Sequence, residues 1–149
     1  MSDAFHGFDH IDVRVASLPA VEPFYDVLLA DLGLPRKRRS HVDAGGEWHD
    51  ASDDRPYNVA EYYELPSPGA VARFIGIIED RAMRPTKTRI AFRLGSRADL
   101  DRMHGRLHEL GAKRIELSED MENYPAVFFE DPAGTNLELC ARHTPADNY

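Results

Sequence analysis

The sequence predicts an α+β fold in which two βαβββ modules pair into a curled mixed sheet around a cleft. Two stretches with nearly the same order of apolar and arginine positions, HIDVRV at 10–15 and RIAFRL at 89–94, open the two halves of the chain. Each stretch leads into an amphipathic helix that ends in Leu-Gly. After each helix, apolar and polar residues alternate with the period of β-strands. This repeated order predicts an internal duplication.

In the first half, a strand is expected at 10–15, followed by a helix within 16–34. Four apolar residues near helical spacing predict the helix: Val21, Phe24, Leu28 and Leu32. The start of the helix has two interpretations. Ser17 is a residue type that caps helices, whereas Pro23 is favoured in the first turn and would then mark a later start.

The rest of the first half returns to a period of two residues. SHVDAGGEWHD at 40–50 is expected to form a hairpin around the turn Ala44-Gly45-Gly46. Two further strands are expected at 57–66 and 71–80.

The second half repeats this order. A helix is expected at 97–112, because Ser96 and Asp99 resemble a capping box and Gly111 is a helix-ending residue. Its apolar stripe consists of Leu100, Met103, Leu107 and Leu110. Three strands follow, at 113–118, 124–130 and 135–141, with the turn Asp131-Pro132-Ala133-Gly134 between the last two.

Each sheet would have one face covered by its helix and a second face that needs cover. Two copies can bury those faces by curling toward each other, which leaves a concave surface suited to a small molecule. We therefore expect one domain over residues 1–149, with module 1 at about 6–82, a linker at about 81–87 and module 2 at about 88–143.

Composition excludes several classes of partner. With 26 acidic and 18 basic residues, the net charge of -8 opposes binding to nucleic acid, and the basic run at 36–39 is interpreted as a solvated strand start. No stretch approaches the roughly 18 apolar residues of a membrane span, and the N-terminus lacks the pattern of a signal peptide. Cys140 is the only cysteine, so an intrachain disulfide is excluded. We expect a cytoplasmic protein that binds neither nucleic acid nor membrane.

Four motifs resemble those of the vicinal oxygen chelate superfamily, which includes glyoxalase I, the extradiol dioxygenases and the bleomycin and fosfomycin resistance proteins. They are FDHIDVRV at 8–15, FYDVLLADLGL at 24–34, RIAFRL at 89–94 and FFEDPAGTNLEL at 128–139. The resemblance implies paired modules, a small-molecule ligand and a homodimer. It leaves the chemistry open, because this fold carries lyases, isomerases, dioxygenases, transferases and metal-free binders.

The resemblance also implies where a metal would bind. In metal-dependent relatives the ligands come from the opening of the first strand and from the last strand of each module. These positions hold His10 and Gly76 in module 1, and Arg89 and Glu138 in module 2. Only His10 and Glu138 can be ligands, whereas a catalytic divalent site normally uses three. Arg89 keeps its proton and offers no lone pair, so it would repel a cation.

Further ligands would be needed to complete a metal site. Glu79 lies three residues beyond Gly76, so regular alternation points it to the opposite face unless a bulge shifts the register. His41 and His49 face each other across the predicted hairpin. Two acidic residues share their face: Asp43 and Glu47. This hairpin group is either a metal site or a solvated polar face, and we favour the solvated face.

Charged residues are expected to line the cleft beside these positions. Asp12 and Arg14 alternate onto the strand face of His10. Arg93 shares a strand face with Arg89. The arginines either neutralise nearby carboxylates or form a pocket for an anionic ligand such as a carboxylate or phosphonate.

Two functions fit these residues. We favour a protein that binds a small, anionic organic ligand in the cleft without a full metal site. Arg89 and Glu138 would form its polar centre, His10 would complete it, and Tyr63 is a further candidate for the lining. The alternative is a metal-dependent lyase or isomerase of the glyoxalase I type. It would hold Zn, Ni, Mn or Fe through His10, Glu138 and a third ligand, with these two residues as the catalytic ones.

Overall fold

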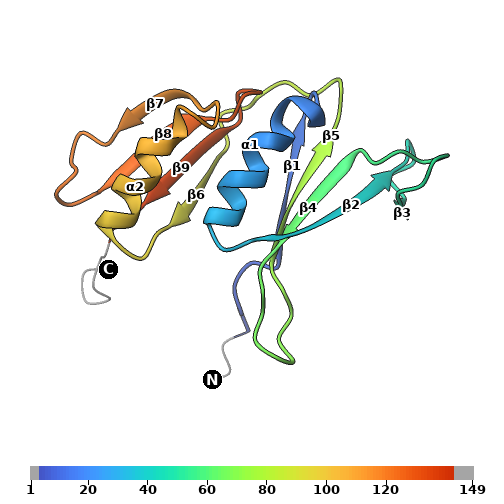
Figure 1. Cartoon of the computed structure of the whole chain (residues 1–149), viewed down its shortest axis with the longest axis horizontal. Helices are drawn as coiled ribbons and strands as arrows, with labels where there is room; N and C mark the ends of the chain where they lie inside the picture. The colour runs from blue at the N-terminus through green and yellow to red at the C-terminus, as the bar shows by residue number, and fades with distance from the viewer. Residues whose placement is uncertain (1–3, 143–149) are drawn as a thin grey trace. The chain divides into compact units, whose positions relative to one another are not determined.

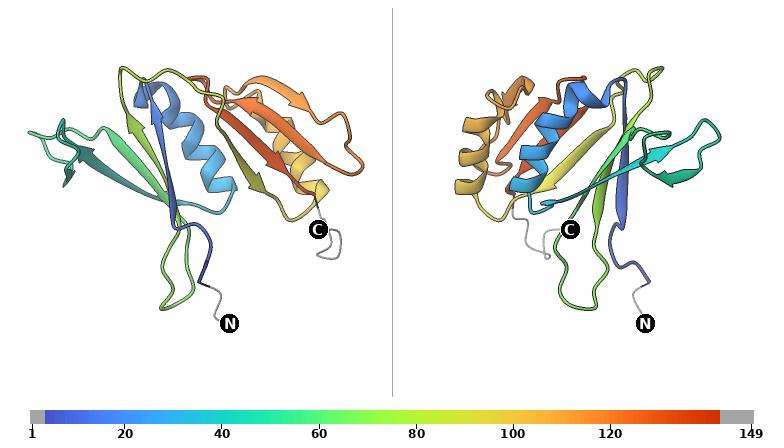
Figure 2. Two further views of the ribbon diagram at one scale, coloured as in Figure 1. Left: turned by 180° about the vertical axis from the view of Figure 1, so that it is seen from behind. Right: turned by 45° about the vertical axis from the view of Figure 1, so that its right-hand side comes forward.

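A computed structural model describes residues 4–142 of the chain and is shown in Figures 1 and 2. The chain divides after Arg84 into two compact units. Each unit contains one mixed β-sheet and one helix, so the predicted α+β fold with a repeated module is confirmed. Among the described residues, no helix has the length and apolar character needed to cross a membrane.

Unit 1 contains a five-stranded sheet and helix α1. Its elements are β1 (His10–Val15), α1 (Leu18–Asp31), β2 (Arg36–Val42), β3 (Trp48–Asp50), β4 (Val59–Tyr63) and β5 (Phe74–Glu79). The strand order is β1-β5-β4-β2-β3, in which β1 and β5 are parallel and the other neighbours are antiparallel. The predicted hairpin is present as β2 and β3, and β3 adds a short strand to one edge of the sheet.

Helix α1 begins directly after Ser17, so the earlier of the two predicted starts is correct. The Ser17 Oγ accepts a hydrogen bond from the backbone N of Ala20 at 3.4 Å. The Glu79 carboxylate accepts a second one from the backbone N of Leu18 at 2.9 Å. Pro23 lies inside the helix and does not mark its start. The buried face of α1 includes three residues of the predicted stripe, Val21, Phe24 and Leu28.

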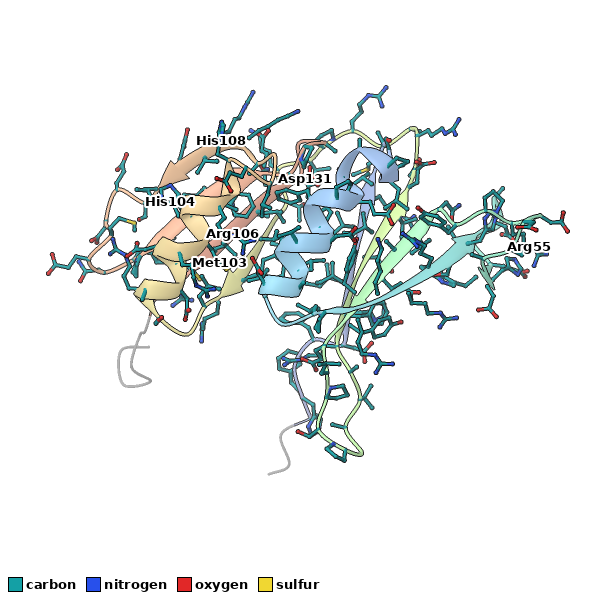
Figure 3. The ribbon with its side chains drawn as sticks, in the orientation of Figure 1. Arg55, Met103, His104, Arg106, His108 and Asp131 are labelled. Atoms are coloured by element: carbon teal, nitrogen blue, oxygen red, sulfur yellow. The ribbon has the colours of Figure 1, made fainter. Side chains whose placement is uncertain are left out.

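Unit 2 contains a four-stranded sheet and helix α2. Its elements are β6 (Arg89–Arg93), α2 (Arg97–Leu107), β7 (Lys113–Leu117), β8 (Ala126–Glu130) and β9 (Asn136–Cys140). The strand order is β6-β9-β8-β7, with β6 and β9 parallel. The Ser96 Oγ accepts from the backbone N of Asp99 at 3.1 Å and caps α2 as predicted. The buried stripe of α2 consists of Leu100, Met103 (labelled in Figure 3) and Leu107.

The strand registers show which positions of the two units correspond. In unit 1, Gly76 of β5 lies opposite Asp12, two residues after the opening residue of β1. In unit 2, Glu138 of β9 lies opposite Ala91, again two residues after the opening residue of β6. Gly76 and Glu138 therefore hold equivalent positions, as the match between their strands predicts.

The turn between β8 and β9 is held by Asp131, which is fully buried (Figure 3). Its Oδ1 accepts hydrogen bonds from the backbone N of Ala133 at 2.8 Å and of Thr135 at 2.9 Å. Gly134 has a φ of 96°, a conformation that glycine adopts without steric cost. The side chain of Asp131 thus fixes the turn that leads into β9 and Glu138.

Replacing Asp131 by alanine is expected to lower the free energy of unfolding by about 1–3 kcal/mol, because two backbone amides lose their buried acceptor. Urea unfolding followed by circular dichroism measures the change. Asp54→Ala, at an exposed loop position, serves as the control. It should change the unfolding free energy by less than about 0.5 kcal/mol. Equal effects of the two substitutions would contradict the role assigned to Asp131.

Candidate functional site

His10 opens β1 on the strand face opposite to the buried Val13 and Val15. Its Nδ1 lies 2.6 Å from Asp9 Oδ2, and its ring stacks on Phe74 with the centroids 4.5 Å apart. The hydrogen bond to Asp9 raises the pKa of His10, and the Asp12 carboxylate adds to this effect. A neutral His10 that donates from Nδ1 keeps a lone pair on Nε2, which lies 3.9 Å from Asp12 Oδ2.

Two carboxylates flank Gly76, the unit 1 counterpart of Glu138. Asp12 of β1 and Glu61 of β4 both lie directly opposite Gly76 in the strand registers. A Cβ atom at Gly76 would lie only 2.7 Å from Asp12 Oδ1. The Asp12 carboxylate therefore leans over the glycine and fills the space that a larger side chain would need.

Glu61 is buried, and both of its carboxylate oxygens accept hydrogen bonds. Ser40 Oγ donates to Oε2 at 2.8 Å, and the Tyr63 hydroxyl donates to Oε1 at 3.0 Å. Arg38 Nε lies 4.0 Å from Oε2. Burial and the hydrogen bond to Glu61 raise the pKa of Tyr63. These contacts hold Glu61 and Tyr63 in one fixed arrangement on the sheet face that also carries His10.

Two other candidates in unit 1 lie apart from this group. Arg14 is exposed at the far end of the His10 face, and its side chain forms no hydrogen bond or ion pair with any residue that the structure describes. Glu79 binds the backbone of Leu18 and lies on the α1 face, as alternation predicts. The structure therefore does not bring Glu79 to His10.

In unit 2, Glu138 is buried and contacted from two sides. The Tyr124 hydroxyl donates to Oε1 at 2.5 Å, and Arg89 Nη1 lies 3.9 Å from Oε2. The Arg89 guanidinium also lies over the Phe128 ring, 4.7 Å from its centroid. The hydrogen bond to Glu138, together with burial, raises the pKa of Tyr124. The structure thus brings Arg89 and Glu138 together, while Arg93 is exposed at the end of β6.

Two residues of these groups, Glu61 and Tyr124, were not among the predicted site residues. Glu61 alternates with Tyr63 on β4. Tyr124 lies just before β8 and alternates with Phe128 onto the face of Glu138. The alternation of side chains along a strand therefore indicated the face on which Glu61 and Tyr124 lie. It identifies the face of a side chain but not the partner that the side chain binds.

The residues present do not fit the divalent metal that the family resemblance implies. Gly76 offers no ligand atom, and Arg89 places a permanent positive charge 3.9 Å from the Glu138 carboxylate. The other oxygen of Glu138 accepts from Tyr124. A cation at Glu138 would meet like-charge repulsion from Arg89. Of the four positions, His10 keeps a ligand atom, Nε2, which lies 3.9 Å from the Asp12 carboxylate rather than near a cation.

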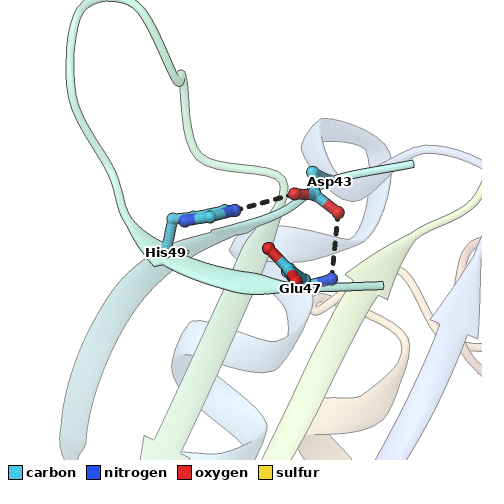
Figure 4. A group of neighbouring side chains, drawn as sticks. All are labelled: Asp43, Glu47 and His49. Carbon is cyan, nitrogen blue, oxygen red and sulfur yellow. Dashed lines mark hydrogen bonds and ion pairs between the residues drawn. The ribbon is translucent and has the colours of Figure 1, made fainter. Parts of the chain in front are cut away.

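The β2–β3 hairpin carries a cluster in which Asp43, Glu47 and His49 place potential ligand atoms within 4.8 Å of one another (Figure 4). Arg55, labelled in Figure 3, lies with Nη1 2.9 Å from His49 Nδ1, and Asp43 Oδ2 lies 2.8 Å from Nε2. Because arginine can only donate, Nδ1 accepts this bond and Nε2–H donates to Asp43. His49 therefore has no lone pair left for a metal.

The other contacts of the β2–β3 hairpin agree with a His49 ring whose two nitrogens are both hydrogen-bonded within the protein. The hydrogen bond from His49 lowers the pKa of Asp43. His41 lies opposite His49 in the strand register, as predicted, with the ring centroids 6.4 Å apart, and its Nδ1 lies 2.7 Å from the carbonyl oxygen of Pro56. These contacts favour the interpretation of the hairpin as a solvated polar face.

The sequence was also compared with known families and proteins. The family model of the Glyoxalase/Bleomycin resistance protein/Dioxygenase superfamily matches residues 7–139. No curated protein matches the sequence.

Several solved structures are similar to this chain. A glyoxalase/bleomycin resistance protein from Albidiferax ferrireducens T118 is 20% identical, with a TM-score of 0.60 and coverage of 91% of this chain and 98% of that one. The fosfomycin resistance protein FosX from Mesorhizobium loti is 19% identical, with a TM-score of 0.55 and coverage of 97% and 98%. A mutant FosX from Listeria monocytogenes, complexed with Mn(II) and dihydroxypropylphosphonic acid, is 20% identical, with a TM-score of 0.54 and coverage of 93% of each chain. Likeness at these identities shows the fold alone.

Proposed function

The chain belongs to the glyoxalase/bleomycin resistance protein/dioxygenase superfamily, and on that basis we propose that it binds a small anionic organic ligand without the divalent metal of its metal-dependent relatives. The acidic group of the ligand binds Arg89, and Glu138 holds that arginine in position. The positive charge of the Arg89 guanidinium thus takes the place of a bound metal ion.

The environment of Arg89 is the observation that carries this proposal. A guanidinium group has five N–H donors in a fixed plane. The contact of Arg89 with Glu138 is 3.9 Å, longer than a hydrogen bond, and about half of the side chain is exposed. Arg89 donates no side-chain hydrogen bond to any residue within 4–142. Among the described residues these donors have no acceptor, and a carboxylate, phosphate or phosphonate can accept two of them in parallel.

The neighbours of Arg89 limit its movement before a ligand arrives. Tyr124 fixes the Glu138 carboxylate through the 2.5 Å hydrogen bond. Glu138 attracts the guanidinium toward the sheet, and the Phe128 ring supports it from one side. An arginine that is held in this way loses less conformational entropy on binding.

Arg93, on the same strand as Arg89, contributes positive charge to the ligand site. The predicted roles of four further residues, all in unit 1, stay predictions: His10, Asp12, Arg14 and Tyr63. The homodimer and the cytoplasmic location are likewise proposals that rest on the family resemblance and on composition.

The alternative function, a metal-dependent lyase or isomerase, needs a third ligand beside His10 and Glu138. Two of the candidates for that ligand are engaged elsewhere. Glu79 accepts a hydrogen bond from the backbone of Leu18, and His49 is hydrogen-bonded through both ring nitrogens. Binding through Arg89 therefore has the better support.

Isothermal titration calorimetry with propylphosphonate and with 1,2-propanediol tests the proposal, since a phosphonate is present in the FosX complex. The phosphonate should bind and the neutral diol should not. The affinity should fall with added salt, because the attraction is between charges that water can reach. A protein that binds neither compound, or binds both equally, would contradict the proposal.

A further inference from the structure

Three aromatic rings form a stack on the face of the unit 1 sheet that carries His10. The rings of His10 and Phe74 are stacked at 4.5 Å with an interplanar angle of 5°, and those of Phe74 and Tyr63 at 4.6 Å with 25°. The three residues lie side by side in the strand registers of β1, β5 and β4. Phe74 covers one face of the Tyr63 ring, and Tyr63 lies opposite Arg36 of the next strand, β2, in the strand register.

A pocket of about 260 Å³ lies at this end of the stack, lined by Arg36, Lys37, Arg38 and Tyr63. Liquid water occupies about 30 Å³ per molecule, so the pocket has room for a small organic group rather than for one or two waters. All four lining residues belong to β2 and β4, within a single unit.

The arginines of the pocket differ in how they are neutralised. Arg38 donates to Asp50 at 2.8 Å and also lies near Glu61. Arg36 lies opposite Tyr63 in register, and its side chain forms no ion pair or hydrogen bond within the described part of the chain. The Lys37 ammonium binds Glu22 and is therefore already paired. The pocket thus combines one aromatic face with one unpaired guanidinium.

We propose that this pocket binds a planar aromatic ring that carries an anionic group, such as an aryl carboxylate or aryl phosphonate. The ring of the ligand stacks on the open face of Tyr63 and continues the stack, while its anionic group pairs with Arg36. The pocket belongs to unit 1 and Arg89 to unit 2, so the inference goes beyond the proposed function: it adds a second anion site, which selects ligands by an aromatic ring.

The surroundings of Tyr63 favour stacking. Phe74 packs against the inner face of its ring, and the hydrogen bond to Glu61 at 3.0 Å fixes the orientation of the hydroxyl. The plane of Tyr63 is therefore set before binding, so little side-chain entropy is lost when a ligand stacks on it. Offset stacking is the arrangement that aromatic pairs prefer.

Titrations with matched pairs of anions test this inference. Benzoate and cyclohexanecarboxylate have the same charge and similar size, but only benzoate is planar, and phenylphosphonate can be compared with methylphosphonate in the same way. The aromatic member of each pair should bind about threefold to tenfold more tightly. Tyr63→Leu should remove this preference, and Tyr63→Phe should keep it.

A second variant keeps the test valid if Tyr63→Leu fails to fold. Arg36→Ala, at an exposed position, should weaken binding of benzoate by about tenfold. Arg102→Ala on the exposed face of α2 is the control and should leave binding unchanged.

The outcomes separate this inference from the proposed function. Equal binding of aromatic and aliphatic anions, lost only in Arg89→Ala, would overturn the inference and leave the proposed function standing. Aromatic preference that depends on Tyr63 and Arg36 but not on Arg89 would support the inference, and titration of propylphosphonate into Arg89→Ala tests the proposed function separately. Absence of binding by all four anions would overturn both.

Discussion

Replacing Arg89 by alanine is expected to weaken the binding of small phosphonates and carboxylates by roughly 10- to 100-fold, the range for loss of charge-assisted hydrogen bonds. The effect is large because the guanidinium has unused donors and lies at the position where metal-dependent relatives hold a ligand. Isothermal titration calorimetry with propylphosphonate measures it.

Arg89→Lys refines this prediction. Lysine keeps the positive charge but lacks the planar pair of donors, so its affinity should lie between those of the wild-type protein and Arg89→Ala. Arg102→Ala removes an equally accessible arginine from α2 and should leave the affinity unchanged. Equal losses in Arg89→Ala and Arg102→Ala would show that net charge, rather than the position of Arg89, determines binding.

The largest loss of folding stability is expected when Glu22 is replaced. This residue is buried between α1 and the sheet of unit 1. Lys37 donates to its Oε1 at 2.5 Å, Arg39 donates to the same oxygen at 3.1 Å, and the Tyr57 hydroxyl donates to Oε2 at 3.0 Å. Glu22→Gln removes the charge that these donors share. At neutral pH it should lower the free energy of unfolding by about 2–3 kcal/mol.

The effect of Glu22→Gln should depend on pH. Burial alone would raise the pKa of Glu22, but the hydrogen bonds from Lys37, Tyr57 and Arg39 outweigh it, so the pKa lies below its usual value of 4.5. The charged carboxylate therefore stabilises the fold above pH 4.5, and this contribution is lost as the pH falls through the lower value of the folded state. The difference in stability between wild type and Glu22→Gln should shrink in acid.

Urea unfolding at neutral and at acidic pH checks both parts of this prediction. Asp101→Ala on α2 is a suitable control, because Asp101 pairs with Arg97 at the exposed surface. Its effect should be below about 1 kcal/mol. A loss of stability in Glu22→Gln that is the same at both pH values would contradict the role of the charge.

The repeated architecture could be predicted because it depends on local patterns. Alternation in HIDVRV and RIAFRL, the apolar stripes of both helices and the capping residue Ser96 all reappear in the structure. The register equivalence of Gly76 and Glu138 could also be predicted, since one strand pattern is repeated. Neither feature requires knowledge of contacts between distant side chains.

The partners in the candidate site could not be predicted in the same way. Glu61 meets Ser40, and Tyr124 meets Glu138, across strands whose pairing the sequence does not specify. His49 has two metal-binding nitrogens in principle, yet Arg55 from the following loop uses one of them. A residue type states which bonds a side chain can form, whereas tertiary contacts decide which bonds remain available.

The positions of the predicted metal ligands show the same difference between what residue types indicate and what tertiary contacts decide. The family motif identifies His10, Gly76, Arg89 and Glu138 as the four relevant positions. The structure adds that Asp12 leans over Gly76 and that Tyr124 and Arg89 contact the two oxygens of Glu138. Two of the four positions that the resemblance implies, Gly76 and Arg89, thus hold residues that cannot be ligands, and both contact a carboxylate.

The most direct test of the central claim is the affinity for propylphosphonate in chelator-treated protein, measured again after addition of Zn²⁺, Ni²⁺, Mn²⁺ or Fe²⁺. Binding through Arg89 predicts the same affinity with and without metal, a loss in Arg89→Ala and little change in His10→Ala. Binding that appears only with metal and is lost in His10→Ala would contradict the claim and favour the metal-dependent enzyme.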